Sequence, residues 1–319
     1  MKVLAAALFA LLAGCNRLSD PCFTPGSLVT ELRVLAVRAD PPEVLVDLDG
    51  GTVPPVEVRA LVAQPEGAAQ DVPVRGRLCV PADGGCPAGS PEVASSTDTE
   101  GVARFTAQVD AEMVRAARDS DPLLGYGGIR VQLDVEARGG GALAQARKML
   151  LYTPQAPGVQ ANRPVELRGV AITYLGSVVG AAGPAGSVSL QVGFPYGVRP
   201  LLADGSIEEY DTTTLDGQRV HLIEHVSYSF YATPLLLYGD VRVENGRAYS
   251  ATGGLQGSDV ADEPGPGDPQ PANGLVRLQG FNQSLQFAWI VARDGRGAVA
   301  WMPFEVDLFG QDIPVSGCN

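Results

Sequence analysis

The most telling property of this 319-residue sequence is how few cations it carries. Lysine occurs only at positions 2 and 148, and 23 basic residues stand against 36 acidic ones, for a net charge of −13. Nucleic-acid-binding domains carry a basic patch or stripe, and this sequence contains no basic cluster. The same negative charge opposes adhesion to an anionic membrane surface. Composition therefore excludes nucleic acid as a partner.

Long apolar runs and helical periodicity are also scarce. After the first 15 residues, no apolar stretch approaches the roughly 20 residues that a transmembrane helix requires. Glycine (39 residues) and proline (25 residues) are frequent, and together with short alternating segments they favour an all-β chain with many turns. The hydrophobic content of 45% is that of a globular protein rather than a disordered one.

The first 15 residues have the form of an export signal. Lys2 precedes an apolar stretch (3–12), small residues and Cys15, which together match a charged start, an apolar core and a small-residue cleavage site. Residues 12–15, Leu-Ala-Gly-Cys, resemble the lipobox of bacterial lipoproteins. The resemblance implies cleavage before Cys15, a diacylglycerol on its thiol and an acyl chain such as palmitate on its new amine.

Several acyl chains on one residue would anchor the protein stably to a membrane. Asn16 is not the aspartate that the inner-membrane retention rule of this family requires. We therefore expect an outer-membrane protein, facing the periplasm or the cell surface, that is held by the lipid on Cys15. The alternative is an ordinary cleaved signal beside an unrelated cysteine.

Four further cysteines follow Cys15, and an even number in an exported chain favours disulfides, with three possible connectivities. Cys79 and Cys86 flank a turn rich in proline and glycine, so a local bridge is predicted there. Cys22 and Cys318 are left as a second pair, which requires the two ends of the chain to meet; the sequence leaves this open. A zinc site at these cysteines would need closer cysteine pairs or nearby histidines, and the sequence has neither.

Short segments with period-2 alternation predict strands in the first half of the chain. The clearest covers 129–136, with residues 144–152 as its hairpin partner across three glycines. Pro41 and Pro42 require the first strand to end or to switch sheets there. The only predicted helix covers 110–117, with Asp110 as its N-cap. The remaining expected strands are 32–37, 56–62, 74–80 and 103–107.

This pattern predicts an immunoglobulin-like β-sandwich, although the Cys–Trp–Cys core of antibody domains is absent. We expect a second β-sandwich after a linker rich in proline and glycine, with a hairpin turn at Asp294-Gly295 and a long exposed loop at 254–274. The predicted organisation is a signal peptide (1–14), a lipidated tether (15–28), a first sandwich (29–153), a linker (154–164) and a second sandwich (165–319). The expected strands of the second sandwich are 165–172, 187–192, 219–223, 226–231, 275–278, 285–293 and 298–306.

Three segments of the body, 32–43, 228–233 and 293–301, resemble parts of uncharacterised bacterial lipoproteins with immunoglobulin-like sandwiches. The resemblance extends over both halves and implies the same architecture and cellular address. It implies no activity.

The two histidines of the chain lie in the segment His221-Leu-Ile-Glu224-His225, which resembles the H-x-x-E-H signature of inverted zinc peptidases. In that family two histidines one helical turn apart bind zinc, and the glutamate activates water. The surrounding residues here are β-branched and aromatic, and on a strand the two histidines would stand about 13 Å apart, too far to share an ion. We therefore expect a strand, and a zinc peptidase through His221, Glu224 and His225 is kept only as an alternative.

Acidic residues offer a second weak alternative. Asp204, Glu208, Glu209 and Asp211 could hold calcium in a loop, although a solvated acidic turn is preferred; the segment that begins at Asp47 lacks the glutamate of a calcium loop. Aromatic residues on strands are assigned to the core rather than to a sugar-stacking platform. These are Tyr228, Phe230, Trp289 and Trp301.

The sequence thus predicts a lipid-anchored, non-catalytic protein of the cell envelope. Its role would be structural or adhesive, or ligand binding through sandwich loops, chiefly residues 254–274, that meet an unknown protein or glycan partner. The only attached group expected is the covalent lipid on Cys15. A zinc peptidase and a calcium-stabilised binding module are the alternatives.

Overall fold

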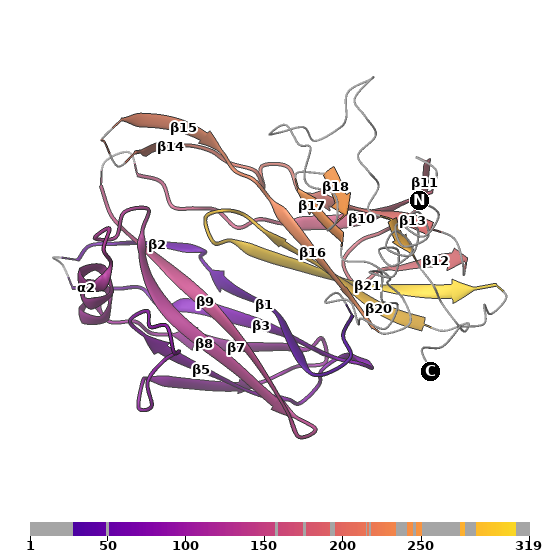
Figure 1. Ribbon diagram of the computed structural model, residues 1–319, viewed down its shortest axis with the longest axis horizontal. Helices are drawn as coiled ribbons and strands as arrows, with labels where there is room; N and C mark the ends of the chain where they lie inside the picture. Colours follow the sequence, from indigo (N-terminus) through magenta and orange to yellow (C-terminus); the bar gives the residue numbers. More distant parts are fainter. Residues whose placement is uncertain are drawn as a thin grey trace, which may run out of the picture.

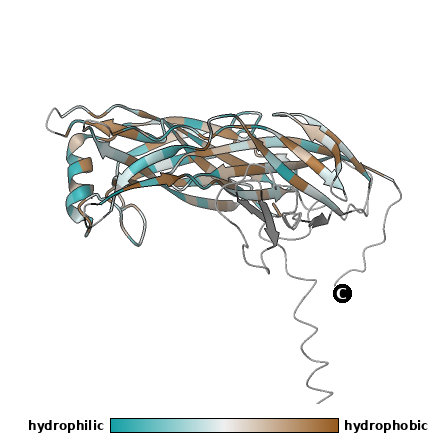
Figure 2. Ribbon diagram, turned by 90° about the horizontal axis from the view of Figure 1, so that it is seen from above, coloured by the Kyte–Doolittle hydropathy of each residue, from teal (hydrophilic) through white to brown (hydrophobic). Residues whose placement is uncertain are grey.

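The computed structural model describes residues 28–48, 51–156, 159–174, 177–191, 195–214, 216, 218–233, 241–244, 247–250, 275–277 and 285–310. These residues form β-strands and one helix, α2 (Ala111–Ser120), so the all-β prediction is confirmed. Strands β1 to β9 lie at one end of the molecule, and most of β10 to β21 lie at the other (Figure 1). Seen from above, the body is elongated, with α2 at one tip (Figure 2).

The first half is a sandwich of two sheets. One sheet has the order β1-β3-β4, with β7 also paired to β3, and the other has the order β2-β9-β8-β5-β6. This division of consecutive strands between two sheets is that of immunoglobulin-like sandwiches. The strands are β1 (Arg33–Asp40), β2 (Glu43–Val46), β3 (Val56–Gln64), β4 (Gly67–Ala68), β5 (Pro73–Cys79), β6 (Glu92–Ser96), β7 (Val102–Ala107), β8 (Ile129–Gly139) and β9 (Ala142–Pro154).

The predicted break after the first strand is present. β1 pairs with β3 in one sheet, whereas β2 crosses to the other sheet and runs parallel to β9. Pro41 and Pro42 have no N–H group to donate to a sheet, so the chain leaves the first sheet between the two strands. Glu43, the first residue of β2, is thereby placed at the end of the sandwich that meets the second half.

Helix α2 begins where the sequence predicts. The side chain of Asp110 accepts a hydrogen bond from the Met113 N–H at 2.7 Å, which satisfies one of the free donors of the first turn. Ala111, Val114 and Ala117 are buried against the sandwich. The helix continues to Ser120, three residues beyond the predicted end.

Cys79 and Cys86 form the predicted local disulfide. The loop that it closes is fixed to β8, because the Cys86 N–H donates to Asp134 at 2.5 Å. Burial raises the pKa of Asp134, but hydrogen bonds from Cys86 and Arg147 outweigh burial, and the net effect lowers the pKa below its usual value.

The second half repeats the arrangement of the first. One sheet has the order β12-β21-β20-β16-β17-β18, and β12 runs parallel to β21 just as β2 runs parallel to β9. The facing sheet has the order β11-β10-β13-β19, and a separate ribbon, β14-β15, is inserted before β16. The strands are β10 (Leu167–Tyr174), β11 (Ser177–Ala182), β12 (Ser187–Gln191), β13 (Pro195–Leu202), β14 (Glu209–Thr213), β15 (Arg219–Ile223), β16 (Ser227–Ala232), β17 (Val241–Glu244), β18 (Arg247–Ser250), β19 (Leu275–Arg277), β20 (Leu285–Arg293) and β21 (Val299–Phe309).

A third hydrophobic core joins the two halves. Leu35 and Leu61 of the first half pack with Trp289 and Val291 of the second half, and all four are nearly or fully buried. Strand β20 is consequently buried on both faces, with Ile290 in the core of the second half and its neighbours in the core shared between the halves. Burial on both faces explains why this strand is an almost continuous apolar run.

The aromatic residues assigned to the core are found there. Tyr228, Phe230 and Trp289 are buried, and Trp301 packs against the shared core. Among the described residues no helix is long and apolar enough to span a membrane. Several predictions fall outside the described residues and remain predictions, namely those on Cys15, Cys22, Cys318 and residues 254–274.

We predict that the two halves unfold together, because their shared core is apolar and buried. Trp289→Ala should lower the free energy of unfolding by about 3–5 kcal/mol, the usual cost of truncating a buried tryptophan. Val178→Ala, at a β11 side chain that is 65% exposed, should change it by less than about 0.5 kcal/mol. Calorimetry showing two separate transitions, only one of them moved by Trp289→Ala, would contradict the prediction.

Candidate functional site

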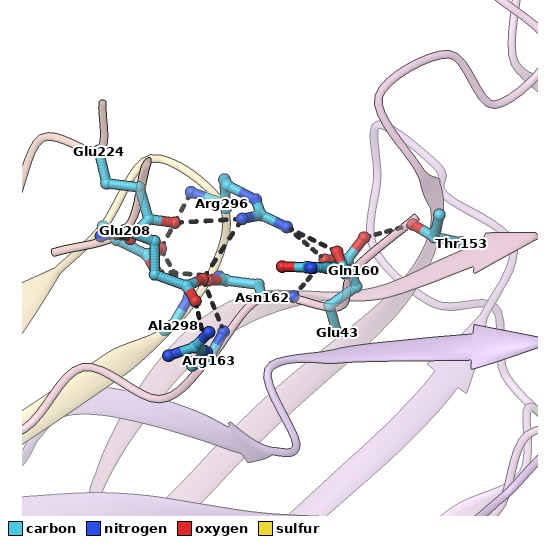
Figure 3. A network of polar contacts seen from close by, with 10 residues as sticks. Glu43, Thr153, Gln160, Asn162, Arg163, Glu208, Glu224, Arg296 and Ala298 are labelled. Atoms are coloured by element: carbon cyan, nitrogen blue, oxygen red, sulfur yellow. Dashed lines mark hydrogen bonds and ion pairs between the residues drawn. The ribbon is translucent and has the colours of Figure 1, made fainter. Parts of the chain in front are cut away.

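The most elaborate polar site in the described structure surrounds Arg296, in the turn between β20 and β21 (Figure 3). Its guanidinium lies 2.8 Å from a carboxylate oxygen of Glu43 and 3.4 Å from oxygens of both Glu208 and Glu224. It also lies over the ring of Tyr210, 4.3 Å from the ring centroid, a cation–π contact. One arginine thus connects four segments of the chain, and we call this group the Arg296 junction.

Each partner reaches the junction from a different element. Glu43 begins β2 in the first half, whereas Glu208 directly precedes β14 and Glu224 directly follows β15, so both lie at the base of the β14-β15 ribbon. The ribbon base is closed by reciprocal backbone and side-chain bonds: the Glu224 N–H donates to the Glu208 carbonyl at 2.9 Å, and the Glu208 N–H donates to the Glu224 carboxylate at 3.2 Å. The inserted ribbon therefore serves to bring two carboxylates to Arg296.

The predicted linker also takes part in the junction. The N–H of Asn162 donates to Glu43 at 2.6 Å, and its side-chain amide donates to Asp294 at 2.9 Å. Thr153, near the end of β9, donates its hydroxyl to the same Glu43. Asn162 is buried, so the segment is fixed to both halves at this residue, while residues 154–156, 159, 160 and 163 are exposed.

The charges of the junction are unequal. The junction contains four carboxylates and two arginines. The carboxylates are those of Glu43, Glu208, Glu224 and Asp294, and the second arginine is the more exposed Arg163, which pairs with Glu208 at 2.8 Å. Burial and the charge of Asp294 raise the pKa of Glu224 to about 7, while a hydrogen bond from the Glu208 N–H and the charge of Arg296 partly oppose this shift. Glu224 therefore exchanges its proton near neutral pH.

The H-x-x-E-H segment does not form a zinc site of the peptidase type. His221 lies on strand β15, while Glu224 and His225 follow the strand, so the helix that this chemistry requires is not formed. His221 is exposed and stands between Asp211 (3.2 Å) and Glu209 (3.3 Å), which raises its pKa through hydrogen bonding. The strand expected at 219–223 is confirmed, and residues 221–225 do not form the helix that the zinc-peptidase alternative requires.

The acidic residues considered for calcium are used elsewhere. Asp204 is fully exposed and 3.8 Å from Arg168, and Glu208 is held by two arginines at the junction. Glu209 and Asp211 pair with His221 on the ribbon. Over the described part of the chain no three His, Cys, Asp or Glu residues are grouped so as to hold a metal ion.

Sequence reasoning missed the residues that matter most here. The sequence predicted a hairpin turn at Asp294, and the structure confirms this turn. The Asp294 carboxylate accepts hydrogen bonds from the N–H groups of Arg296 and Ala298. Sequence reasoning gave no role to Arg296, Glu43 or Asn162. Arg296 and Glu43 are 253 positions apart, and neither carries a local motif that indicates its partner. The one available signal was an arginine in a turn within a chain poor in cations.

Comparison with known proteins assigns no family to the chain. No protein-family model matches it, and no curated protein matches it. Solved structures that resemble it remotely include red sea bream transglutaminase (TM-score 0.25, 8% identity, 89% of this chain and 32% of that one) and a chimeric titin Z1Z2 tandem (TM-score 0.24, 11% identity, 90% and 100%). A bacterial ice-binding adhesin is another (TM-score 0.23, 11% identity, 90% and 100%). The chain thus spans about a third of the transglutaminase. At these scores no statement about function follows from any of them.

We predict a specific pH dependence from Glu224. The folded protein keeps the proton up to about pH 7 and the unfolded chain releases it near 4.5, so the folded state binds more protons between these values. The contribution of Glu224 to the free energy of unfolding should therefore fall as pH rises through this window, by on the order of 2 kcal/mol, and then level off. The measurement is the free energy of unfolding in urea, from pH 4 to 8.5, for the native chain and for Glu224→Gln. The difference between the two values at each pH gives the contribution of Glu224.

The control for that experiment is Glu66→Gln, at an exposed position, which should leave the native profile unchanged. A native-minus-variant difference that is flat with pH, or that rises from pH 4.5 to 7, would contradict the assignment of the titrating group.

We further predict that Arg296→Ala destabilises the protein by about 3–5 kcal/mol, because it leaves buried carboxylates without their counter-charge. Arg138→Ala is the matched control: Arg138 pairs with Glu136 on the surface of β8 at 2.6 Å, and exposed pairs contribute about 0–1 kcal/mol. Chemical denaturation of both variants at pH 8, where Glu224 is ionised, gives the clearest separation. Equal losses would show that the junction adds nothing beyond a surface pair.

Proposed function

We propose that this protein is a lipid-tethered, non-catalytic component of the bacterial cell envelope that presents a rigid two-sandwich body at the outer membrane. The Arg296 junction is the observation that carries the proposal. Its buried carboxylates are engaged with Arg296: Glu43 reaches it from the first half, and Glu224, whose pKa is about 7, holds it from within the second half. An enzyme would direct such a group toward a substrate; here it accepts hydrogen bonds from Arg296 and from the backbone N–H of Glu208.

Rigidity suits a displayed binding or scaffolding surface. A third apolar core and the Arg296 junction both oppose motion between the halves, whereas small or polar interfaces between domains generally permit it. A preorganised body loses less entropy when it binds a partner. We infer a protein or glycan partner that meets loops of the sandwiches, with the lipid on Cys15 holding this surface at the membrane.

The tether is tested by growing a bacterial host that expresses the full chain on an alkyne analogue of palmitate. The native chain should be labelled, and Cys15→Ser should lose the label and keep its signal peptide, because no thiol remains to accept the lipid. Labelled bands in a gel and the mass of the N-terminal peptide provide the two measurements.

Asn16→Asp is the matched variant for cellular address. It should keep the label but move from the outer-membrane to the inner-membrane fraction on a density gradient, since aspartate at this position marks retention in the lipoproteins that residues 12–15 resemble. A native chain that takes up no label, or a Cys15→Ser chain that is still labelled, would refute the proposed anchor.

A further inference from the structure

A cavity of 440 Å³ lies between the two halves, beside the Arg296 junction. Its first wall is formed by β1, from Val34 to Val37, and by β9, from Ala146 to Met149. Its second wall is formed by Tyr231 and by the β20-β21 turn, which reaches over the first half (Figure 1). The volume lies within the range of pockets that hold small molecules, roughly 300–1,000 Å³.

The cavity lies where the first sandwich is open. β2 pairs with β9 only from Leu151 to Pro154, so the stretch of β9 that lines the cavity pairs with β8 alone. β1, on the other side, belongs to the opposite sheet. The switch of the chain between sheets at Pro41 and Pro42 therefore leaves this space, and the turn of the second half forms its other wall.

Two cations line the cavity without a carboxylate partner among the described residues. The amine of Lys148 donates to the Gly297 carbonyl, and the guanidinium of Arg293 donates to the Leu35 carbonyl at 3.1 Å and to the Ser229 hydroxyl at 3.0 Å. All of these acceptors are neutral. Charges placed together at a largely buried interface are costly unless an opposite charge joins them.

The one carboxylate that lines the cavity, Asp294, makes no ion pair with either cation. One oxygen of Asp294 accepts from the N–H groups of Arg296 and Ala298, and the other accepts from the Asn162 amide. Burial lowers the pKa of Lys148 to about 8; the charge of Arg293 adds to this shift and the charge of Asp294 opposes it. The cavity thus has excess positive charge in a chain whose net charge is −13.

The rest of the lining is mixed: Arg147, which pairs with Asp134, and Tyr231 carry polar groups, and the other side chains are apolar. Val37 and Val299 are nearly buried, and Val34 and Met149 also border the cavity. A ligand that fits these walls needs an anionic group for the two cations and a short apolar portion for the valines and the methionine. A bare inorganic anion would leave the apolar wall uncovered.

We propose that this cavity binds a small amphiphilic carboxylate, whose carboxylate contacts Lys148 and Arg293 and whose short apolar chain packs on Val34, Met149 and Val299. Charge-assisted hydrogen bonds of this kind are the stronger ones in proteins. The site joins residues of both halves, so its occupant would also stabilise their arrangement. The inference does not depend on the lipid anchor or on the surface partner proposed above.

The test uses the full chain in phosphatidylcholine vesicles, with hexanoate as the probe and calorimetry as the readout. Hexanoate should bind saturably, with a dissociation constant below about 10 mM. Inorganic phosphate, which lacks the apolar portion, and hexanol, which lacks the charge, should each bind at least about tenfold more weakly. Absence of saturable binding, or equal binding of hexanoate and phosphate, would overturn the proposal.

Two variants distinguish this site from general attraction of anions. Lys148→Met keeps the length of the side chain and should weaken hexanoate binding about tenfold or more. Arg138→Met removes the same charge from an exposed position and should leave binding within about twofold. Hexanoate binding by Lys148→Met that equals that of the native chain would refute the role of this amine.

A second measurement covers the case in which Lys148→Met fails to fold. Lys148 is the only lysine after residue 2, so acetylation by acetic anhydride, read by mass spectrometry of its peptide, reports on this one amine in the native chain. Saturating hexanoate should slow the acetylation at least about fivefold, because an ion-paired amine is a poor nucleophile. Acetylation at the same rate with and without hexanoate would overturn the proposal.

Discussion

The apolar contact between the outer face of β1 and β3 and the outer face of β20 and β21 is the constraint on which the other features depend. It buries Trp289 and Val291 against Leu35 and Leu61, and apolar burial is the main favourable term in folding. Once the sheets meet there, the β20-β21 turn is carried over the end of the first sandwich. Arg296 is thereby removed from most of the solvent, and this position brings its guanidinium within reach of the three glutamates that pair with it.

Buried ion pairs are weak evidence of stability, because desolvation offsets much of the attraction. The Arg296 junction therefore explains the specificity of the arrangement better than its strength. Apolar surfaces alone permit sliding, whereas a guanidinium that must satisfy Glu43, Glu208 and Glu224 together permits one register. The same register sets the shape of the neighbouring cavity and the separation of Lys148 from Arg293.

Local patterns predicted the first half well. Alternation in β8, the glycine turn before β9, the Asp110 cap of α2 and the proline break after β1 are all decided by residues within a few positions of each other. The short strands β2, β4 and β6 were missed. In the second half β11, β13, β14, β17 and β18 were missed as well, since several are rich in glycine, alanine or charged residues and form only because a partner strand lies beside them.

The sequence by itself determined the all-β class, the disulfide between Cys79 and Cys86, the strand at His221 and the expectation of a lipid on Cys15, because each rests on neighbouring residues. Only the tertiary structure decided that Asn162 of the predicted linker is buried, that the halves share a core, and that Glu43, Glu224 and Arg296 meet. Contacts between residues up to 258 positions apart depend on how two sheets face each other, and no local spacing encodes that arrangement.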